Sequence, residues 1–397
     1  MPITPLQISH YTLTSALGKG VDENLQALRS ATSGLQPCSL QEVEFETWIG
    51  RVEGVEDEPL PEHLQAFDCR NNRLAWMAVV EDGFRSTVQS AIERIGSERI
   101  GLFIGTSTSG IASTESAYQH RDIETGSLTP EYSPQHSHNI FSSCWFLREA
   151  LALKGPALTI STACSSSAKV FAAAHRYISS GLCDAAVVGG VDSLCLTTLY
   201  GFNSLGLISP QPCRPWGVER DGINIGEAAG FVLLEPVNGS EHQGLFLGYG
   251  ESSDAYHMST PHPDGEGAAM AMRQAIERAG LSSDRIDYIN LHGTATPSND
   301  AAEDKAVWRL FNDSVACSST KGWTGHTLGA AGITEAVFSL LSLKHGFLPG
   351  TMQTEKIDPA LHTSVLLESR STALHYVLSN SFGFGGSNCS LLFGSRN

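Results

Sequence analysis

The stretch ALTISTACSSSAKVFAAAHRYISSG, residues 157–181, predicts a short strand, a turn of small residues and a helix that ends at Gly181. Cys164 lies at the corner between the strand and the helix. A thiol at the start of a helix faces free backbone N–H groups and the positive end of the helix dipole, which favour the thiolate. The same corner is also compatible with a buried cysteine that packs as a small apolar residue. Cys164 alone does not decide between these two interpretations.

The rest of the chain alternates predicted strands and helices, which indicates an α/β fold. One helix is predicted over residues 72–92, where apolar residues recur at helical spacing. The segment GLFIGTSTSG (101–110) has the same form as YINLHGTATP (288–297), which we interpret as a strand that runs into a polar loop. Such an internal repeat predicts two similar halves whose loops meet at a shared site. A polar stretch near residue 240 divides the halves.

Composition excludes several classes of protein. With 397 residues, 41% of them hydrophobic, the chain can bury a large core. It has neither a long apolar run nor a signal-peptide pattern, so we expect a cytoplasmic protein without membrane association. The net charge of −17 argues against nucleic acid as a partner. Nine cysteines without a CxxC pair fit reduced thiols. His136 and His138 lack a third ligand at suitable spacing, so no metal site is predicted.

Three polar loops of the second half each follow a predicted strand. NLHGTATPSND contains His292, STKGWTGHTLGAAG contains Lys321 and His326, and NSFGFGG contains Phe382 and Phe384. A reactive thiol, nearby imidazoles and backbone N–H groups that could hold an oxyanion are the parts that acyl transfer requires. Each of these histidines and aromatic residues is, taken singly, also compatible with a structural role.

Four segments together resemble the β-ketoacyl-acyl-carrier-protein synthases, of the elongating synthase I/II type. They are TACSSS (162–167), HGTATPSND (292–300), TKGWTGHTLGAAG (320–332) and NSFGFGGSN (380–388). The resemblance spans nearly the whole chain and keeps the family's motif order. It implies the thiolase fold, a five-layered αβαβα stack of two similar halves, here residues 1–240 and 241–397. It also implies a homodimer, with a heterodimer that includes a ketosynthase-like subunit left open.

The resemblance assigns roles to individual residues. Cys164 would hold the growing acyl chain as a thioester, and His292 and His326 would stabilise the enolate formed when the malonyl unit loses carbon dioxide. Lys321 matches the family's structural lysine, and we expect Glu303 to be its ionic partner. The remaining implied roles are the oxyanion and gating residues Phe384 and Phe382, the phosphopantetheine-binding residues Thr294 and Thr296, the acyl-pocket residue Thr108, and the carrier-docking residues Arg70 and Arg73.

The implied activity extends an acyl chain by two carbons on an acyl carrier protein. No cofactor is expected beyond the phosphopantetheine that arrives with that carrier. Trp216, Trp323 and Thr108 depart from common family residues, which favours a specialised pathway, such as aryl-polyene or type II polyketide-like synthesis, over ordinary fatty acid synthesis. Two alternatives remain: a coenzyme A-dependent thiolase-like or initiating synthase, and a non-catalytic subunit that resembles a chain length factor. The histidine pair argues against the first, and Cys164 argues against the second.

Overall fold

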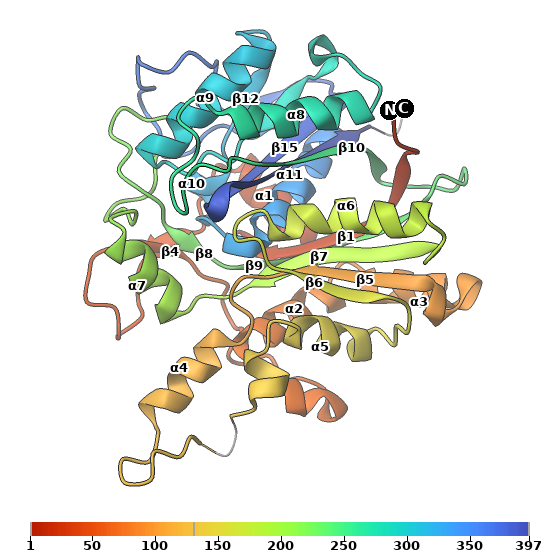
Figure 1. Ribbon diagram of the computed structural model, residues 1–397, viewed down its shortest axis with the longest axis vertical. Coiled ribbons are helices and arrows are strands. Elements are labelled where there is room, and N and C mark those ends of the chain that lie inside the picture. Colours follow the sequence, from red (N-terminus) through yellow and green to blue (C-terminus); the bar gives the residue numbers. More distant parts are fainter. Residues whose placement is uncertain (1, 130–131, 396–397) are drawn as a thin grey trace.

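The computed structural model describes residues 2–129 and 132–395, in which three helix layers alternate with two sheet layers (Figure 1). This is the αβαβα arrangement that the sequence predicted. The strands of the first half follow the order β6-β5-β7-β9-β1, and those of the second half follow β12-β11-β15-β16-β10. The first-half strands are β6 (Ala157–Ile160), β5 (Ile100–Gly105), β7 (Ala185–Asp192), β9 (Ala228–Pro236) and β1 (Leu6–Ser15), and the second-half strands are β12 (Ala316–Ser318), β11 (Tyr288–Asn290), β15 (Tyr376–Gly383), β16 (Ser387–Gly394) and β10 (Gly244–Ser253).

The two half-sheets share one pattern of strand directions. In each, the first three strands in this order are parallel and the last two pairings are antiparallel. The halves join where β1 pairs with β10 over three residues, from Leu6 opposite Phe246 to Ile8 opposite Gly244. The segment near residue 240 connects β9 to β10. Strand β5 therefore corresponds to β11, and β7 to β15, so the internal repeat read from the sequence is present in the topology.

The helices cover both outer faces and fill the space between the half-sheets (Figure 1). The inner helices α6 (Ser166–Ser179) and α11 (Ala331–His345) lie side by side in the middle layer. Helices α2 (Arg70–Val80), α3 (Phe84–Ile95) and α5 (Ser142–Ala150) cover the first half, and α8 (Glu266–Arg278) and α9 (Pro297–Phe311) cover the second. The described chain also contains α1 (Gly20–Arg29), α4 (Ile111–Gln119), α7 (Leu196–Ser204), α10 (Lys321–Thr324), β2 (Gly18–Lys19), β3 (Leu35–Pro37), β4 (Trp48–Gly50), β8 (Ile225–Gly226), β13 (Phe347–Leu348) and β14 (Arg370–Ser371).

A very close crossing of α6 and α11 places the site. A Cβ atom on Gly332 would lie 2.4 Å from the backbone nitrogen of Ala168, so only glycine fits there. Next to this crossing, the backbone N–H of Ile333 donates to the hydroxyl of Ser167 at 2.9 Å. The N-terminal ends of the two inner helices are thereby held together, and with them the loops that contain Cys164 and His326.

The predicted single helix over residues 72–92 is wrong. The chain leaves the helix after Val80 and begins α3 at Phe84, because Asp82 and Gly83 both adopt positive φ angles. The carboxylate of Asp82 accepts hydrogen bonds from the backbone N–H of Val21 and the hydroxyl of Thr12. These tertiary contacts override the local helical pattern. Among the described residues, no helix is both long enough and apolar enough to span a membrane.

Candidate active site

Cys164 lies at a tight corner between β6 and α6. Ala163 has a φ angle of 52°, a left-handed conformation that turns the chain sharply before the cysteine. The hydroxyl of Ser166 stabilises this turn, because it accepts the backbone N–H of Thr162 at 2.9 Å and donates to the carbonyl of Ala163 at 2.6 Å. The corner points the thiol of Cys164 into a pocket that also contains His292 and His326.

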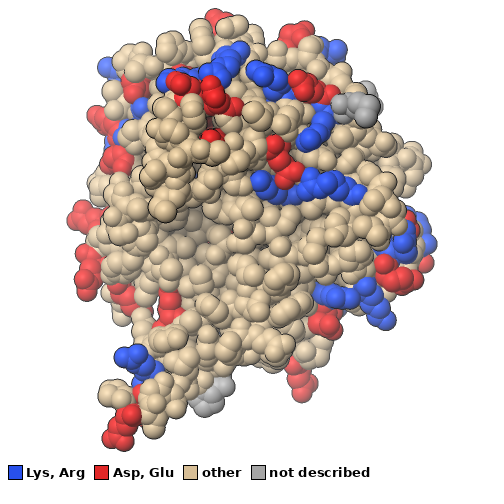
Figure 2. Space-filling model, viewed as in Figure 1, with Lys and Arg blue, Asp and Glu red and all other residues tan. Residues whose placement is uncertain are grey.

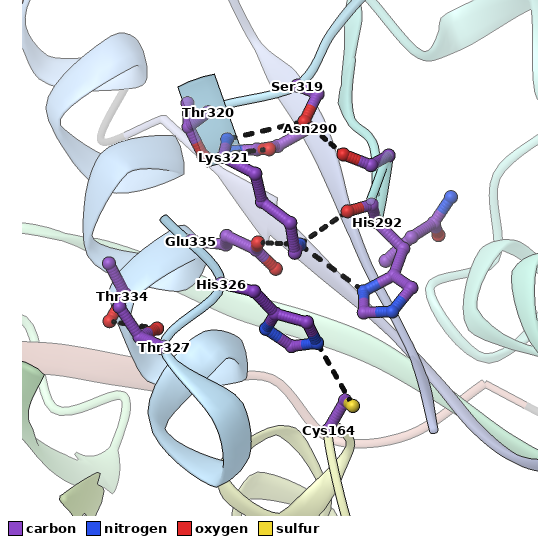
Figure 3. Close-up of polar contacts among 12 residues, drawn as sticks. Cys164, Asn290, His292, Ser319, Thr320, Lys321, His326, Thr327, Thr334 and Glu335 are labelled. Carbon is purple, nitrogen blue, oxygen red and sulfur yellow. Dashed lines mark hydrogen bonds and ion pairs between the residues drawn. The ribbon is translucent and has the colours of Figure 1, made fainter. Parts of the chain in front are cut away.

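His326 contacts the thiol directly. Its Nε2 lies 3.0 Å from Sγ of Cys164, and its Nδ1 accepts the backbone N–H of Leu328 at 3.2 Å (Figure 3). Because Nδ1 is occupied as an acceptor, the ring proton of the neutral imidazole is on Nε2. His326 therefore presents an N–H donor to the sulfur and to any substrate oxygen beside it.

His292 presents the same kind of donor from the opposite side. The ammonium of Lys321 lies 3.4 Å from its Nδ1, so this nitrogen is also an acceptor and the proton is again on Nε2. The two imidazole rings meet edge to face, with centroids 5.3 Å apart. Sγ of Cys164 and one nitrogen from each ring all lie within 4.8 Å of one another. Two fixed N–H donors thus converge beside one thiol.

Burial controls the charge of all three groups. It lowers the pKa of His292 and of His326 well below the usual value, and the positive charge of Lys321 lowers both further, so the rings are neutral at physiological pH. Burial also raises the pKa of the Cys164 thiol to about 11, although Lys321 and the backbone N–H of Phe384 act in the opposite direction. Of the two interpretations of the Cys164 corner, the raised pKa favours a protonated, buried thiol in the resting protein.

The same three groups have the ligand types of a transition-metal site. A metal would need the Nε2 lone pairs of His292 and His326. Because Nδ1 of each ring accepts a hydrogen bond, each Nε2 carries the ring proton and has no lone pair to offer. The arrangement favours hydrogen-bond donation over metal ligation.

The ionic partner predicted for Lys321 is wrong. Its ammonium lies 2.5 Å from a carboxylate oxygen of Glu335 on α11, and it also donates to the backbone carbonyl of His292 (Figure 3). Both side chains are almost fully buried. Glu335 was missed, although a single carboxylate within the apolar run ITEAVFSLL indicates a buried charge that needs a partner. Lys321 is thereby positioned to donate to His292.

Glu303 holds the backbone of the His292 loop instead. From α9 its carboxylate accepts the backbone N–H groups of His292 and Gly293, each at 2.8 Å, and the side-chain amide of Asn380 at 3.1 Å. Burial raises the pKa of Glu303 to about 7. The first turn of α9, residues 297–300, was read from sequence as part of a polar loop, although Thr296 caps the helix through the N–H of Asn299 and Pro297 is its first residue.

The pocket mouth contains the predicted threonines and phenylalanines. Thr294 and Thr296 line it, and their hydroxyls are 2.9 Å apart. Phe382 packs against the ring of His292, with ring centroids 5.9 Å apart. Phe384 packs against Phe202 of α7, with ring centroids 5.3 Å apart. The approach of the glycine-rich turn to Cys164 requires Gly383, because a Cβ atom there would lie 2.8 Å from the carbonyl oxygen of Thr162.

Thr108 does not line this pocket. Its side chain is buried and donates to a carboxylate oxygen of Asp192 at 2.8 Å. Its backbone N–H donates to the same oxygen at 2.9 Å. The hydroxyl thus stabilises the loop after β5, and the expected contact between Thr108 and an acyl chain stays a prediction.

Arg70 and Arg73, the predicted carrier-docking residues, both form ion pairs within the chain, and their docking role stays a prediction. The guanidinium of Arg70 is bidentate on the fully buried carboxylate of Glu227, at 2.9 and 2.5 Å, and its side chain is only 15% exposed. Arg73 pairs with Asp68 at 2.6 Å. On the face drawn in Figure 2, Lys and Arg residues lie among Asp and Glu residues and form no separate basic patch. Both arginines stabilise the packing of α2.

Known proteins with similar sequences cover nearly the whole chain. Residues 62–239 match the family description "Beta-ketoacyl synthase, N-terminal domain", and residues 244–355 match "Beta-ketoacyl synthase, C-terminal domain". A 3-oxoacyl-[acyl-carrier-protein] synthase 2 of Vibrio cholerae is 32% identical over 96% of each chain. One from Rhizobium meliloti is 37% identical over 74% of this chain and 73% of the relative.

Solved structures agree with this result. One similar structure is the ketosynthase ApeO from Xenorhabdus doucetiae, which was solved in complex with its chain length factor ApeC. ApeO is 39% identical to this chain, with a TM-score of 0.89 over 99% of this chain and 98% of the other. A β-ketoacyl synthase from Burkholderia phymatum is 27% identical, with the same TM-score over the full length of both chains. Fold and site together define a thiolase-fold acyltransferase. The chain belongs to the β-ketoacyl synthase family.

Proposed function

We propose that this protein is a 3-oxoacyl-[acyl-carrier-protein] synthase that joins an acyl group on Cys164 to malonyl-acyl carrier protein, with loss of carbon dioxide. The observation that carries the proposal is the convergence of two neutral imidazole N–H donors, from His292 and His326, on the pocket that contains the Cys164 thiol. No resident cofactor is needed, because the phosphopantetheine arm enters with the carrier past Thr294 and Thr296.

In the first half-reaction, Sγ of Cys164 attacks the thioester of an acyl carrier. The sulfur gives up its proton, the acyl group becomes bonded to Sγ, and the carrier leaves as a free thiol. The backbone N–H groups of Cys164 and Phe384 lie at the sulfur, where they stabilise negative charge. The N–H of His326 adds a third donor, which offsets the high pKa of the buried thiol as the bond forms.

In the second half-reaction, the malonyl thioester loses carbon dioxide and becomes an enolate. Negative charge develops on its thioester oxygen, and Nε2–H groups of His292 and His326 are positioned to donate to it. The enolate carbon then attacks the acyl carbonyl on Cys164 and expels the thiolate, which regains a proton. The product is a β-ketoacyl carrier two carbons longer. Neutral rings suit this step, because they donate protons in hydrogen bonds without protonating the enolate carbon.

Two other functions have less support. A thiolase-like or initiating synthase is disfavoured, because both histidines are held as donors by Lys321 and by the N–H of Leu328. A non-catalytic subunit is disfavoured, because Cys164 is present and contacts His326 at 3.0 Å.

The pathway we propose is a specialised one, such as aryl-polyene or type II polyketide-like synthesis, with a second ketosynthase-like subunit as partner. The support is the 39% identity to ApeO, which was solved with its chain length factor, and the similar fold of the ishigamide ketosynthase/chain length factor at 25% identity and a TM-score of 0.89. Strand β6 offers a place for that subunit. It lies at the sheet edge, and its residues Ala157–Ile160 are half-exposed. Light scattering of the chain alone and with a co-expressed ketosynthase-like subunit tests this pairing.

Acylation of Cys164 tests the activity. We expect the wild-type protein to gain the mass of the acyl group at Cys164 when incubated with an acyl carrier, and to release β-ketoacyl carrier after malonyl carrier is added. Cys164→Ala abolishes both products, whereas Cys183→Ala, at a buried cysteine outside the pocket, keeps them. Unchanged condensation by Cys164→Ala would overturn the proposal. Preference for long saturated over polyenoyl or aryl donors would overturn the specialised pathway.

A further inference from the structure

Helix α7 carries one wall of the pocket mouth, but few buried contacts hold it. Phe202 on this helix lines the pocket and packs against Phe384, with ring centroids 5.3 Å apart. Among the nine residues of α7, only Leu199 is buried. Leu199 and Phe202 pack into a small apolar cluster on the inner side of the helix, and polar contacts at its ends and outer face complete the support.

The N-terminus of α7 is capped by a residue of another helix. The side chain of its own N-cap residue, Cys195, makes no capping hydrogen bond to a backbone N–H of the first turn. Instead, the carboxylate of Glu115 accepts the backbone N–H of Leu196 at 2.9 Å and both the backbone N–H and the hydroxyl of Thr197 at 2.6 Å. A carboxylate at this end of a helix satisfies free N–H groups and interacts favourably with the helix dipole.

Glu115 belongs to α4, the helix that projects from the body of the protein (Figure 1). Within α4 only Ala117 is buried, while Tyr118 and the following Ile123 are 55% and 97% exposed. The projecting helix thus contacts the pocket wall through Glu115. A second contact on the outer face of α7 joins the hydroxyl of Tyr200 to the carbonyl of Glu42 at 2.7 Å.

We propose that Glu115 is a positioning residue for acyl-chain selection, which acts by holding α7 so that Phe202 rests against Phe384. The inference rests on the proposed condensing activity, because it concerns which acyl groups pass this aromatic pair to reach Cys164. Loss of the carboxylate leaves the N–H groups of Leu196 and Thr197 without their anionic acceptor. Helix α7 then shifts or frays at its first turn, and the contact between the two aromatic rings loosens.

A competition experiment with the full-length protein tests this coupling. Equal amounts of hexanoyl and dodecanoyl carrier are offered together, and the ratio of the two adducts on Cys164 is measured by mass spectrometry. We expect Glu115→Gln to change this ratio by roughly fivefold, the effect of losing a helix cap. Glu124→Gln, which changes an exposed carboxylate on the same projecting segment, keeps the wild-type ratio. An unchanged ratio in Glu115→Gln overturns the proposal.

A double-mutant cycle separates this coupling from general loosening of the fold. Phe202→Ala should change the adduct ratio directly. If the Glu115 carboxylate acts through Phe202, adding Glu115→Gln to Phe202→Ala should change the ratio no further. Independent, additive effects overturn the proposal. If Glu115→Gln does not fold, Thr197→Val replaces it in the cycle, because it removes one of the three hydrogen bonds to the carboxylate.

A carrier-free measurement distinguishes failure of this inference from failure of the proposed function. Alkylation of Cys164 by N-ethylmaleimide and by a maleimide with a twelve-carbon chain requires passage through the same mouth but no condensation chemistry. If wild-type protein accepts no acyl carrier, the proposed function fails, and the maleimide ratio still tests Glu115. If that ratio is the same in Glu115→Gln and Glu124→Gln, the inference itself fails.

Discussion

The loop after β5 and the loop after β11 occupy equivalent places in the two halves, yet only the second presents an imidazole to the pocket. Each is organised by a buried carboxylate, Asp192 for the first and Glu303 for the second. Glu303 binds backbone N–H groups and leaves the imidazole of His292 free to face the pocket. Asp192 binds the side-chain hydroxyls as well, so none of them faces the substrate.

The hydrogen bonds of Asp192 explain this difference. Its carboxylate accepts the hydroxyls of Thr106, Ser107 and Thr108, together with two backbone N–H groups of the same loop. It also accepts the N–H of Gly329 at 2.5 Å, in the loop that contains His326. The first-half loop therefore acts as a structural clamp between the halves, whereas the imidazole of its counterpart faces the pocket. Glu303 accepts two backbone N–H groups and the side-chain amide of Asn380, and none of these bonds uses the ring of His292.

The largest effect that this comparison predicts is on activity, when the second loop is made to resemble the first. His292→Thr removes one of two donors to the developing enolate and should slow condensation by about 10²- to 10³-fold. Because His292 is buried and Lys321 donates to its ring, we also expect the free energy of unfolding to fall, by about 1–3 kcal/mol. Release of carbon dioxide from malonyl carrier and urea unfolding measure the two quantities.

The matched variant lies in the first loop. Thr106→Val removes a hydroxyl that donates to Asp192 at 2.6 Å, and should lower stability while leaving condensation within a few-fold of wild type. If Thr106→Val slowed condensation as much as His292→Thr, the proposed division between a structural and a chemical loop would be wrong.

Sequence alone predicted the fold and the centre of the site, because both depend on local patterns. The repeat of strand, polar loop and helix predicted the two halves, and the loops of Cys164, His292, Lys321 and His326 do converge. Their catalytic roles remain predictions. What connects these loops depends on residues far apart in the chain, which no local pattern specifies. The pairing of Lys321 with Glu335 instead of Glu303 is one example.

The charged residues were the least predictable part. Arg70 was predicted as a docking residue from the family resemblance, but its ionic partner Glu227 is 157 residues away and no local pattern indicates it. The pKa of Cys164 has a similar origin: the helix start is visible in the sequence, whereas the burial that raises the pKa to about 11 is not. Long-range burial and pairing therefore limit what the chain reveals by itself.

A smaller effect, on stability, should follow from neutralising the first carboxylate. Asp192→Asn replaces a charged acceptor of several hydrogen bonds with an amide that has one acceptor oxygen, and should lower the free energy of unfolding by about 2–3 kcal/mol. Asp184→Asn is the control, because Asp184 forms an exposed ion pair with Arg99 worth at most about 1 kcal/mol. Equal losses in urea unfolding would show that Asp192 is not the clamp we describe.

The smallest effect concerns Glu303, the carboxylate of the second loop. Glu303→Gln keeps the size of the side chain but can no longer accept both N–H groups of His292 and Gly293 as a carboxylate does, so we expect condensation to fall by roughly tenfold. Protonation should act in the same direction. Because the pKa of Glu303 is raised to about 7, wild-type condensation should decline as the pH falls through 7.

Stability should respond to pH with the opposite sign. The pKa of Glu303 is about 7 in the folded protein, against the ordinary value of 4.5 for a glutamate in the unfolded chain, so between these values the folded state binds more protons. Linkage then makes this contribution to folding largest at low pH, and it is lost as the pH rises through 7. Glu335, whose pKa burial also raises to about 7, contributes with the same sign. Glu303→Gln therefore removes part of both pH dependences, in activity and in urea unfolding. If the pH profiles of activity and of unfolding were the same in Glu303→Gln as in the wild type, Glu303 would not titrate in this range. The second loop would then be held by its hydrogen bonds at every pH from 5 to 8.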